Sequence, residues 1–533
     1  MKLKLAALTC SVVLACSLTG CGGNNNASAP AGKAPAENVS QSAEKTAEST
    51  TAAAAEMPSS DVKVQESVVV GIKAQITSMD VQSVSNVAHN IPYKLTHSTL
   101  VTMNLDTGEI LPDLAESWEW TDDVTIEFKL REDAKFHNGE PVTARDVVYT
   151  FERGREGIAS SNKMKPAKEV TEVDEHTVRM VLDAPNLDWL DTISLPVFSI
   201  LSEKALQDDP DKGYEIGAGP YMVKEFVSKD YLALTRFEDY MDGPIPTVNL
   251  TLRYIPEASS RLIALQTGEI DLCQDPDTIE LDTIKDDPNL RLVEFEGTTC
   301  QFFAFNCKNE LTSNKYLRQA IACAVNKQDI MDATINGYGT IADSFWGPTQ
   351  FGYVDNFETW PYDLEKAKEL MKEAGFENGV DLEVTVASGA RVITAEILQS
   401  QLKEIGVNVI INEVDSAALT SITNEARHQG LVYGLGFNTA GDEVRRVYGE
   451  GSSTNRSHYY NEKVVELMDK AVQEFDENKR LEYYKEIQEI AKEDIPVIPL
   501  YYEKNFWGVK KNVGGVTWYG NSNVDLSTVY VEQ

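Results

Sequence analysis

The chain has 533 residues, and 48 Lys and Arg face 84 Asp and Glu, so the formal net charge is −36. That acidity argues against nucleic acid or an anionic membrane surface as a main partner, because both require basic protein surface. Hydrophobic residues make up 42% and aromatic residues 8% of the chain, as in folded proteins. The only long apolar run stands at the N-terminus, which excludes an integral membrane transporter.

The N-terminal residues have the features of an export signal. Lys2 and Lys4 precede an apolar stretch from Leu5 to Leu18 that is too short for a comfortable membrane span. The stretch ends in Leu18-Thr19-Gly20-Cys21, which resembles a bacterial lipobox. We expect residues 1–20 to be a lipoprotein signal peptide and Cys21 to carry the lipid. The alternative is an ordinary secretory signal with a chance Cys.

Residues 22–60 are rich in Gly, Asn, Ala, Ser, Thr, Pro and Glu and contain almost no large apolar residue. Such a segment cannot bury enough surface to fold. Residues 21–61 are therefore expected to be a lipidated Cys followed by a disordered tether. The expected location is the outer face of the bacterial cytoplasmic membrane or the periplasmic side of the envelope.

Strand patterns dominate the first half of the remaining chain. Residues 68–72 (VVVGI) suit a buried strand, and apolar residues alternate with polar ones over 124–130. Similar patterns occur at 177–183, 231–237 and 248–255. Thr143 and Asp146 have the spacing of a capping box and predict the start of a helix.

Strands and helices alternate more regularly in the second half. Asp363 and Gly375 suit the two ends of a helix over 363–374, and Gly406 suits the end of another over 392–405. The remaining expected elements are strands at 301–306, 381–387 and 407–414 and helices at 315–334, 461–475 and 477–494. This alternation predicts an α/β region with at least partly parallel strands.

Residues 113–153 contain an ordered series of short motifs. They are LAESW (114–118), FxLR (128–131), KFHxGxP (135–141) and TAxDV (143–147). This stretch resembles the signature of the family 5 extracellular solute-binding proteins, which serve ABC importers of dipeptides, oligopeptides and nickel. Further similar stretches extend the resemblance over residues 65–533. Read as chemistry alone, the signature is scaffold, so His137 is expected to be structural.

The resemblance implies an α/β, two-lobed periplasmic-binding-protein-like fold of type II. That fold has a first lobe with an extra subdomain, two hinge strands that join the lobes, and a ligand cleft between the lobes. Mapped onto this chain, lobe I is 62–95, 215–299 and 500–533, the extra subdomain is 96–214, and lobe II is 300–499. The expected hinge strands are Gln301–Asn306 and Val497–Tyr501.

The resemblance also suggests where a ligand would bind. Peptide-binding members hold the peptide ammonium with an Asp, and our alignment places Asn438 at that position, with Asp442 four residues later. Either the ammonium clamp is missing or displaced, because Asn cannot neutralise an amine, or Asp442 supplies it. Arg391 is the candidate for the carboxylate of a dipeptide, although a solvated side chain at the start of a helix is the alternative.

Aromatic residues complete the candidate site. Trp346, Tyr353 and Phe437 are expected to form walls of the cleft, and Asn306 ends a hinge strand beside it. An aromatic side chain in a Pro/Gly loop can instead cap a hydrophobic core, so Trp346 has both interpretations.

The resulting hypothesis is a lipid-anchored protein that captures a peptide or peptide-like solute and delivers it to the permease subunits and ATPases of an ABC importer. We expect a monomer with no cofactor, no metal and no nucleic-acid partner. We also expect no enzymatic activity, since no HExxH, P-loop, GxSxG or CxxC motif occurs. Alternatives are binding of a nickel chelate, with His458 as the nearest ligand, another non-peptide solute, a peptide sensor not coupled to import, and, remotely, a secreted hydrolase. The export compartment permits disulfides, and the pairing of Cys273, Cys300, Cys307 and Cys323 is left open.

Overall fold

A computed structural model describes Pro58 and residues 63–84, 89–104, 109–157, 160–348, 350–436, 445–518 and 524–533, with position 518 described by its backbone only. Two compact units divide the chain at residues 51 and 52, and all described residues belong to the second. The signal peptide, Cys21 and most of the tether lie outside the described residues, so those expectations stay predictions. Within the described part, no helix is long and apolar enough to cross a membrane.

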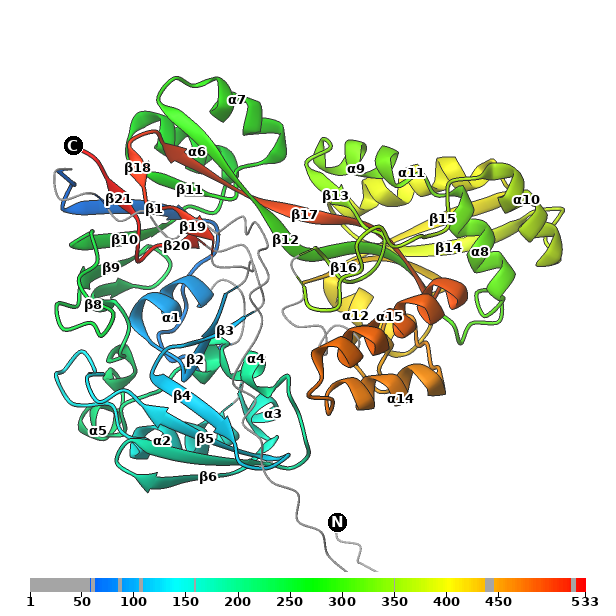
Figure 1. Ribbon diagram of the computed structural model, residues 1–533. Helices are drawn as coiled ribbons and strands as arrows, with labels where there is room; N and C mark the ends of the chain where they lie inside the picture. Colours follow the sequence, from blue (N-terminus) through cyan, green and yellow to red (C-terminus); the bar gives the residue numbers. More distant parts are fainter. Residues whose placement is uncertain are drawn as a thin grey trace, which may run out of the picture. The chain divides into compact units, whose positions relative to one another are not determined.

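One large sheet connects the two lobes. Among the described residues it contains eleven strands in the order β15-β14-β16-β12-β17-β11-β1-β10-β9-β8, with β13 paired to β17. Two long antiparallel strands, β12 (Leu290–Phe305) and β17 (Val497–Lys510), run from one lobe into the other and cross between them (Figure 1). They extend the expected hinge strands toward lobe I, and the two-lobed α/β fold is confirmed.

Lobe I is built on the parallel strands β11, β1 and β10, continued by antiparallel β9 and β8. Its buried apolar residues include Val68, Val70, Leu250 and Leu252, which alternate along two neighbouring strands as the sequence pattern predicts. The elements are β1 (Ser67–Ile72), α1 (Asn90–Thr96), β8 (Tyr221–Val227), β9 (Tyr231–Arg236), β10 (Asn249–Tyr254), α6 (Ala258–Thr267), β11 (Leu272–Gln274), α7 (Leu281–Asp286), β18 (Val513–Gly514), β19 (Thr517–Trp518), β20 (Val524–Asp525) and β21 (Tyr530–Val531).

The extra subdomain has its own four-stranded antiparallel sheet in the order β4-β5-β7-β6. The predicted capping box forms. The hydroxyl and the backbone N–H of Thr143 donate to Asp146 Oδ2 at 2.7 and 3.0 Å, and α2 begins directly after Thr143. The elements are β2 (Val101–Met103), β3 (Ile110–Pro112), β4 (Ala115–Trp120), β5 (Thr125–Leu130), α2 (Ala144–Glu156), α3 (Ser161–Met164), β6 (Ala167–Asp174), β7 (Thr177–Leu182), α4 (Trp189–Ile193) and α5 (Glu203–Asp208).

Lobe II contains parallel strands β15, β14 and β16, with β16 antiparallel to β12. Helices pack on both faces of this sheet, so the second half of β14 and the first half of β16 are buried on both sides, whereas the edge strand β15 exposes Asn408 and Ile410. The elements are α8 (Lys315–Ala324), α9 (Lys327–Ile335), β13 (Gly339–Ile341), α10 (Leu364–Glu373), β14 (Val380–Ala387), α11 (Ala390–Lys403), β15 (Val407–Val414), α12 (Ser416–Asn424), β16 (Gly430–Gly436), α14 (Glu462–Ala471) and α15 (Glu477–Asp494).

One predicted helix is wrong as a single element. The expected helix over 315–334 is broken into α8 and α9, because Val325 is extended and the Asn326 side chain caps the backbone N–H groups of Gln328 and Asp329. The other helices and strands predicted in this half are confirmed to within a few residues, except that the strand expected at 301–306 begins already at Leu290. Helix α10 begins after the Asp363 cap, and Gly375 adopts φ +85° after its end.

Separate hydrophobic cores support the division into lobes. The large buried clusters of lobe I, the extra subdomain and lobe II are separate, and a small additional cluster of Val81, Tyr93, Leu201 and Leu206 joins lobe I to the extra subdomain. We propose on this basis that lobe I, the extra subdomain and lobe II follow the boundaries given above, except that residues 500–502 belong to lobe II. Leu500, Tyr501 and Tyr502 pack in the cores of lobe II, which moves the crossing point of the second hinge strand to Glu503.

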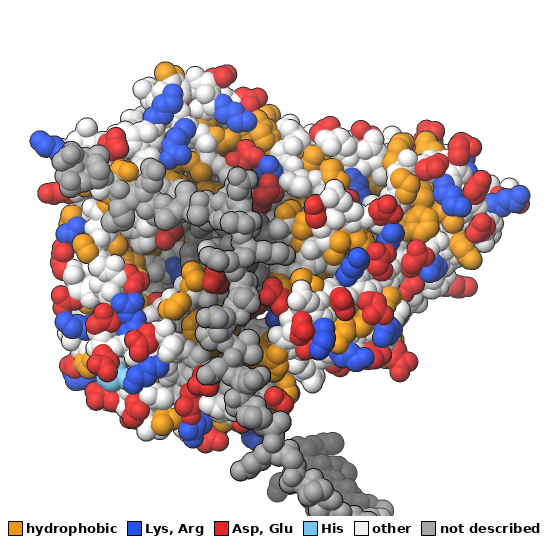
Figure 2. All heavy atoms as spheres, viewed as in Figure 1, with side chains coloured by type: hydrophobic (Ala, Val, Ile, Leu, Met, Phe, Trp, Pro, Cys, Tyr) orange, Lys and Arg blue, Asp and Glu red, His pale blue; other side chains and the backbone are white. Residues whose placement is uncertain are grey.

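Charged side chains are spread over the visible surface. Figure 2 shows Asp and Glu side chains over all parts of this face, interspersed with Lys and Arg. The negative net charge is thus distributed over the solvated surface on the face shown.

Candidate functional site

Carboxyl ends of parallel strands from both lobes point toward the crossing of β12 and β17. In lobe I, Lys73 follows β1 and Asp275 follows β11. In lobe II, β14 leads through Gly389 into α11, whose second residue is Arg391. Ligands of open α/β sheets bind outside the carboxyl ends of parallel strands. The crossing of the hinge strands (Figure 1) is therefore the candidate binding site.

Gln301 on β12 and Glu503 on β17 are the central polar residues of this site. The Gln301 Nε2 donates to Glu503 Oε1 at 2.7 Å, and its Oε1 accepts from Arg391 Nε at 3.4 Å. Burial raises the pKa of the Glu503 carboxyl, and the hydrogen bond from Gln301 partly offsets that effect. The charges of Asp275, Arg391 and Lys73 also act on this carboxyl, so groups from both lobes converge on one hinge residue.

Lys73 and Asp275 form an ion pair on the lobe I side. The backbone N–H of Lys73 also donates to Gln274 Oε1 at 3.0 Å, which ties the ends of β1 and β11 together. Both charged side chains are partly exposed, at 44% and 34%. Both side chains therefore reach solvent at the carboxyl ends of β1 and β11.

Tyr433 on β16 lies between two arginines. The guanidinium carbon of Arg391 is 5.2 Å from the Tyr433 ring centroid, and that of Arg456 is 5.4 Å away. Arg456 donates to Thr423 Oγ1 at 2.6 Å and to Asn424 Oδ1 at 2.9 Å, at the C-terminal end of α12. Sequence reasoning found Arg391 but missed Arg456, whose neighbours on α12 and β16 come together only in the fold.

Three of the predicted ligand residues, Phe437, Asn438 and Asp442, lie outside the described residues. The choice between Asn438 and Asp442 as the amine-binding position therefore stays a prediction. Strand β16 ends at Gly436, so this segment follows directly from the strand that carries Tyr433.

Asn306 is a structural residue. Its side chain is fully buried and its Nδ2 donates to the carbonyl oxygens of Ala426 and His428, both at 2.8 Å. Its Oδ1 accepts from the backbone N–H of Lys308 at 3.1 Å. The expectation that Asn306 contacts a ligand is corrected, because its amide is used to join β12 to the turn before β16.

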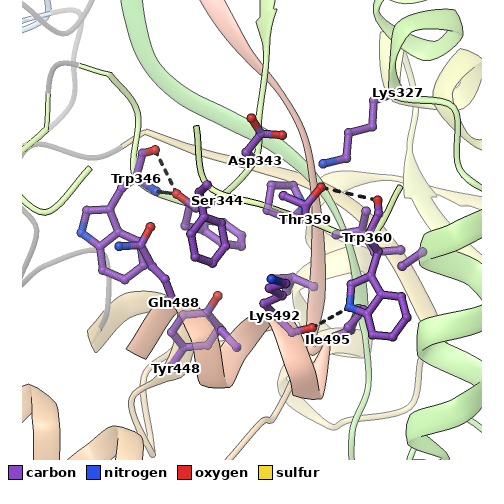
Figure 3. A pocket seen from close by; sticks show the side chains of 17 residues that line it. Lys327, Asp343, Ser344, Trp346, Thr359, Trp360, Tyr448, Gln488, Lys492 and Ile495 are labelled. Carbon is purple, nitrogen blue, oxygen red and sulfur yellow. Dashed lines mark hydrogen bonds between the residues drawn. The ribbon is translucent and has the colours of Figure 1, made fainter. Parts of the chain in front are cut away.

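Trp346 lies inside lobe II. Its side chain is 1% exposed, and its ring centroid is 6.0 Å from that of Tyr484 on α15. It lines an internal cavity of about 50 Å³ that Figure 3 shows from close by. This volume suits a few water molecules and not a peptide. The expected role of Trp346 as a cleft wall is therefore replaced by a role in the core. Tyr353 is half-buried and packs against the same core.

Residues of that cavity come from lobe II alone. Trp360 Nε1 donates to the Lys492 carbonyl oxygen at 2.9 Å (Figure 3). Lys327 Nζ donates to the Ala342 carbonyl oxygen at 2.7 Å. The first bond joins the loop before α10 to the C-terminal turn of α15, and the second joins the start of α9 to the residue that follows β13. The cavity is a packing feature beside the hinge strand β17, whose residues Val497 and Ile498 form one wall.

The histidines of interest are held by backbone groups. Nδ1 of His137 accepts from the Gly217 N–H at 3.2 Å and Nε2 lies 3.0 Å from the Gly219 carbonyl oxygen. Burial lowers the pKa of His137 to about 4, so the ring is neutral, in agreement with its expected structural role. His458 Nε2 is 2.8 Å from the Thr423 carbonyl oxygen. Across the described residues, no cluster of three His, Cys, Asp or Glu suits a metal ion.

The cysteine side chains contribute to packing. Cys273, Cys307 and Cys323 are free thiols, and burial raises the pKa of Cys307 and Cys323 to about 11. Cys300 is buried in the core of lobe II. Of the four, only Cys307 is partly exposed.

The sequence profile of the bacterial extracellular solute-binding proteins, family 5 (middle region), matches residues 109–455 of this chain. The chain belongs to this family. This family 5 member is 27% identical over 474 residues to heme-binding protein A of Haemophilus influenzae, covering 81% of this chain and 86% of that protein.

The dipeptide-binding protein of Escherichia coli is 27% identical over 459 residues, covering 79% of this chain and 86% of that protein. A solved structure, the periplasmic binding protein DppA of Helicobacter pylori in complex with the peptide STSA, superposes with a TM-score of 0.72 at 26% identity. The superposition covers 88% of this family 5 protein and 98% of that chain. The family assignment and the type II two-lobed fold predicted from the signature at 113–153 are both confirmed.

Proposed function

We propose that this solute-binding protein captures a peptide or peptide-like solute between its lobes and delivers it to an ABC importer. The observation that carries the proposal is the convergence of Arg391, Glu503, Lys73 and Asp275 on the hinge crossing. These residues supply two positive and two negative charges, which match the two charged ends of a peptide. Its similarity to a dipeptide-binding protein and to a structure solved with a bound peptide supports the same solute class.

Arg391 is the proposed partner of the solute carboxylate. Its guanidinium has five N–H donors, and among the described residues it makes one long hydrogen bond, to Gln301. A bidentate pair with a carboxylate would use the remaining donors. The first turn of α11 follows Gly389, which offers no side chain to cap the helix, so its backbone N–H groups also favour an anion.

The remaining parts of the hypothesis follow from this role. We propose that Cys21 anchors the protein to the membrane, that residues 22–61 act as a tether, and that the protein works as a monomer without catalysis. Closure of the lobes around solute would produce the two states that a permease can distinguish.

Native mass spectrometry of the protein as purified, followed by denaturing identification of released molecules, tests the solute class. Co-purified peptides, with their lengths and terminal groups, would support peptide capture. A metal–chelator complex, a heme, or a small acid without an amine would refute it. An Arg391→Gln variant should lose co-purified peptides, whereas Arg445→Gln, which changes an exposed ion pair on lobe II, should retain them.

A further inference from the structure

Gln301 holds two opposite charges apart at the hinge. Its carboxamide donates to Glu503 and accepts from Arg391, and the structure has no direct ion pair within 4.0 Å between these two described residues. A guanidinium has five donors and a carboxylate about four acceptor sites. Because the bridging amide uses one of each, both charged groups keep most of their hydrogen-bonding capacity.

The other charges near Glu503 are already matched. Lys73 pairs with Asp275 on the lobe I side. The adjacent residue on β17, Lys504, has Nζ 2.8 Å from a Glu294 carboxylate oxygen and 3.3 Å from one of Glu296. Glu503 therefore differs from these acidic neighbours, since its side-chain hydrogen-bond partner among the described residues is a neutral amide.

Burial makes this arrangement costly without a cation. A buried carboxylate requires pairing or several hydrogen bonds to offset lost hydration. Glu503 receives one short hydrogen bond, and burial together with the charge of Asp275 raises its pKa more than Gln301, Arg391 and Lys73 lower it. An ammonium group that reached Glu503 would supply a positive charge in direct contact with the carboxyl.

The four hinge charges, Lys73, Asp275, Arg391 and Glu503, sum to zero. A zwitterionic solute placed with its carboxylate at Arg391 and its amine at Glu503 would keep that sum at zero while giving each of these two residues a charged partner. A solute with a blocked amine would leave Glu503 with Gln301 alone and would introduce an unmatched negative charge.

We propose that Glu503, on the hinge strand β17, is the anchor for the positively charged amino group of the solute. This inference rests on the proposed function and narrows it to solutes that carry a free amine together with a carboxylate. It places amine recognition on the hinge itself. Bound solute would then contact the strand whose two halves move when the lobes open.

Calorimetric titration of full-length protein in detergent tests the proposal with two matched peptide mixtures. One contains peptides of two to four residues with free amino ends, and the other contains the same peptides N-acetylated. The wild type should bind the free mixture at least tenfold more tightly. Glu503→Gln should reduce this preference to within twofold, and Glu503→Asp, which retains the charge, should keep part of it.

Glu294→Gln is the matched control, because Glu294 lies on the other hinge strand and pairs with Lys504. This variant should preserve the full preference for free amines. Equal binding of both mixtures by the wild type would overturn the amine anchor and leave peptide capture standing. A preference that persists in Glu503→Gln would also overturn it. Failure of the wild type to bind either mixture would refute peptide capture itself, and the anchor with it.

The wild-type comparison keeps the test decisive if Glu503→Gln does not fold, since discrimination against acetylated peptides needs no variant. Glu503→Asp then provides the residue assignment, through a partial and selective loss of affinity for free amines. An equal loss for both mixtures in Glu503→Asp would indicate a purely structural role and would contradict the proposal.

Discussion

A contact away from the hinge joins the extra subdomain to lobe II. Nη2 of Arg480, on α15, lies 2.7 Å from Oδ1 of Asp188, the residue just before α4. The backbone N–H of the neighbouring Leu187 donates to the Val472 carbonyl oxygen at 2.9 Å. The guanidinium of Arg480 also lies over the Phe351 ring at 4.7 Å. We predict that this ion pair holds the lobes closed on the side away from the hinge.

The size of the effect follows from burial. The Asp188 and Arg480 side chains are 11% and 18% exposed, so the burial of this ion pair is intermediate. Ion pairs on the surface contribute about 0–1 kcal/mol to stability, whereas disruption of a fully buried pair costs about 3–5 kcal/mol. We expect a coupling of about 2 kcal/mol, which is roughly a thirtyfold change in the ratio of closed to open forms. Burial and the charge of Asp188 raise the pKa of the nearby Asp191 to about 8, so Asp191 is mostly neutral at pH 7 and does not compete for Arg480.

Pulsed EPR distance distributions between spin labels at the exposed positions Asp208 and Glu482 measure the two forms. Asp188→Asn, Arg480→Gln and the double variant form a cycle whose interaction energy is the coupling. Arg445→Gln is the control, because its partner Asp469 lies in the same lobe and both side chains are about half exposed. A coupling below about 0.3 kcal/mol, within the additivity expected of independent sites, would refute the argument.

Three further predictions concern stability. His137 is held neutral in the folded protein, with a pKa of about 4 instead of the ordinary 6.5, so the unfolded state binds more protons as the pH falls. Urea unfolding should therefore show that this group lowers the unfolding free energy by about 2 kcal/mol between pH 6.5 and pH 5. An unfolding free energy that does not change over this pH range would contradict the prediction. Thr143→Ala removes the hydroxyl of the α2 capping box and should lower the unfolding free energy by about 1 kcal/mol, with Thr143→Ser as a control that retains it. Gly297→Ala would place a methyl carbon 1.9 Å from the Glu503 carbonyl oxygen at the strand crossing, so this variant should separate β12 from β17 and lower the melting temperature. Gly451→Ala is the control, because no atom lies within 4 Å of its added methyl group. It should lower the melting temperature only by the smaller cost of the positive φ at that position.

Local patterns predicted most of the elements. Alternation, cap residues and glycine stops act within a few residues, and they placed β14, α10 and β15 almost at their observed bounds. The failure at 315–334 has a local cause as well. Apolar residues continue at helical spacing through Ile330 and Met331, which hid the cap formed by Asn326.

Candidate site residues were harder to predict, because their type indicates possible chemistry but not their direction. Trp346 suits a ligand wall, and Asn306 suits a hydrogen-bonding ligand contact, yet the first packs on Tyr484 and the second binds two backbone carbonyls. Arg391 was found because it was the only basic residue in its segment. Arg456 was missed because its contact with Tyr433 depends on how α12 packs beside β16.

Glu503 shows what a sequence of this kind conceals. Gln301 and Glu503 are 202 positions apart, and they meet because Gln301 pairs with Tyr501 across antiparallel strands. Glu503, two residues beyond Tyr501, lies on the same face of the sheet and within reach of the Gln301 amide. The register between the strands shifts on both sides of this position, between Glu296 and Cys300 and between Gln301 and Phe302. A slip of one residue would turn Glu503 to the opposite face. The irregular pairing at the hinge therefore determines which charges face the site, and in this protein the element that permits movement also supplies the proposed recognition residue.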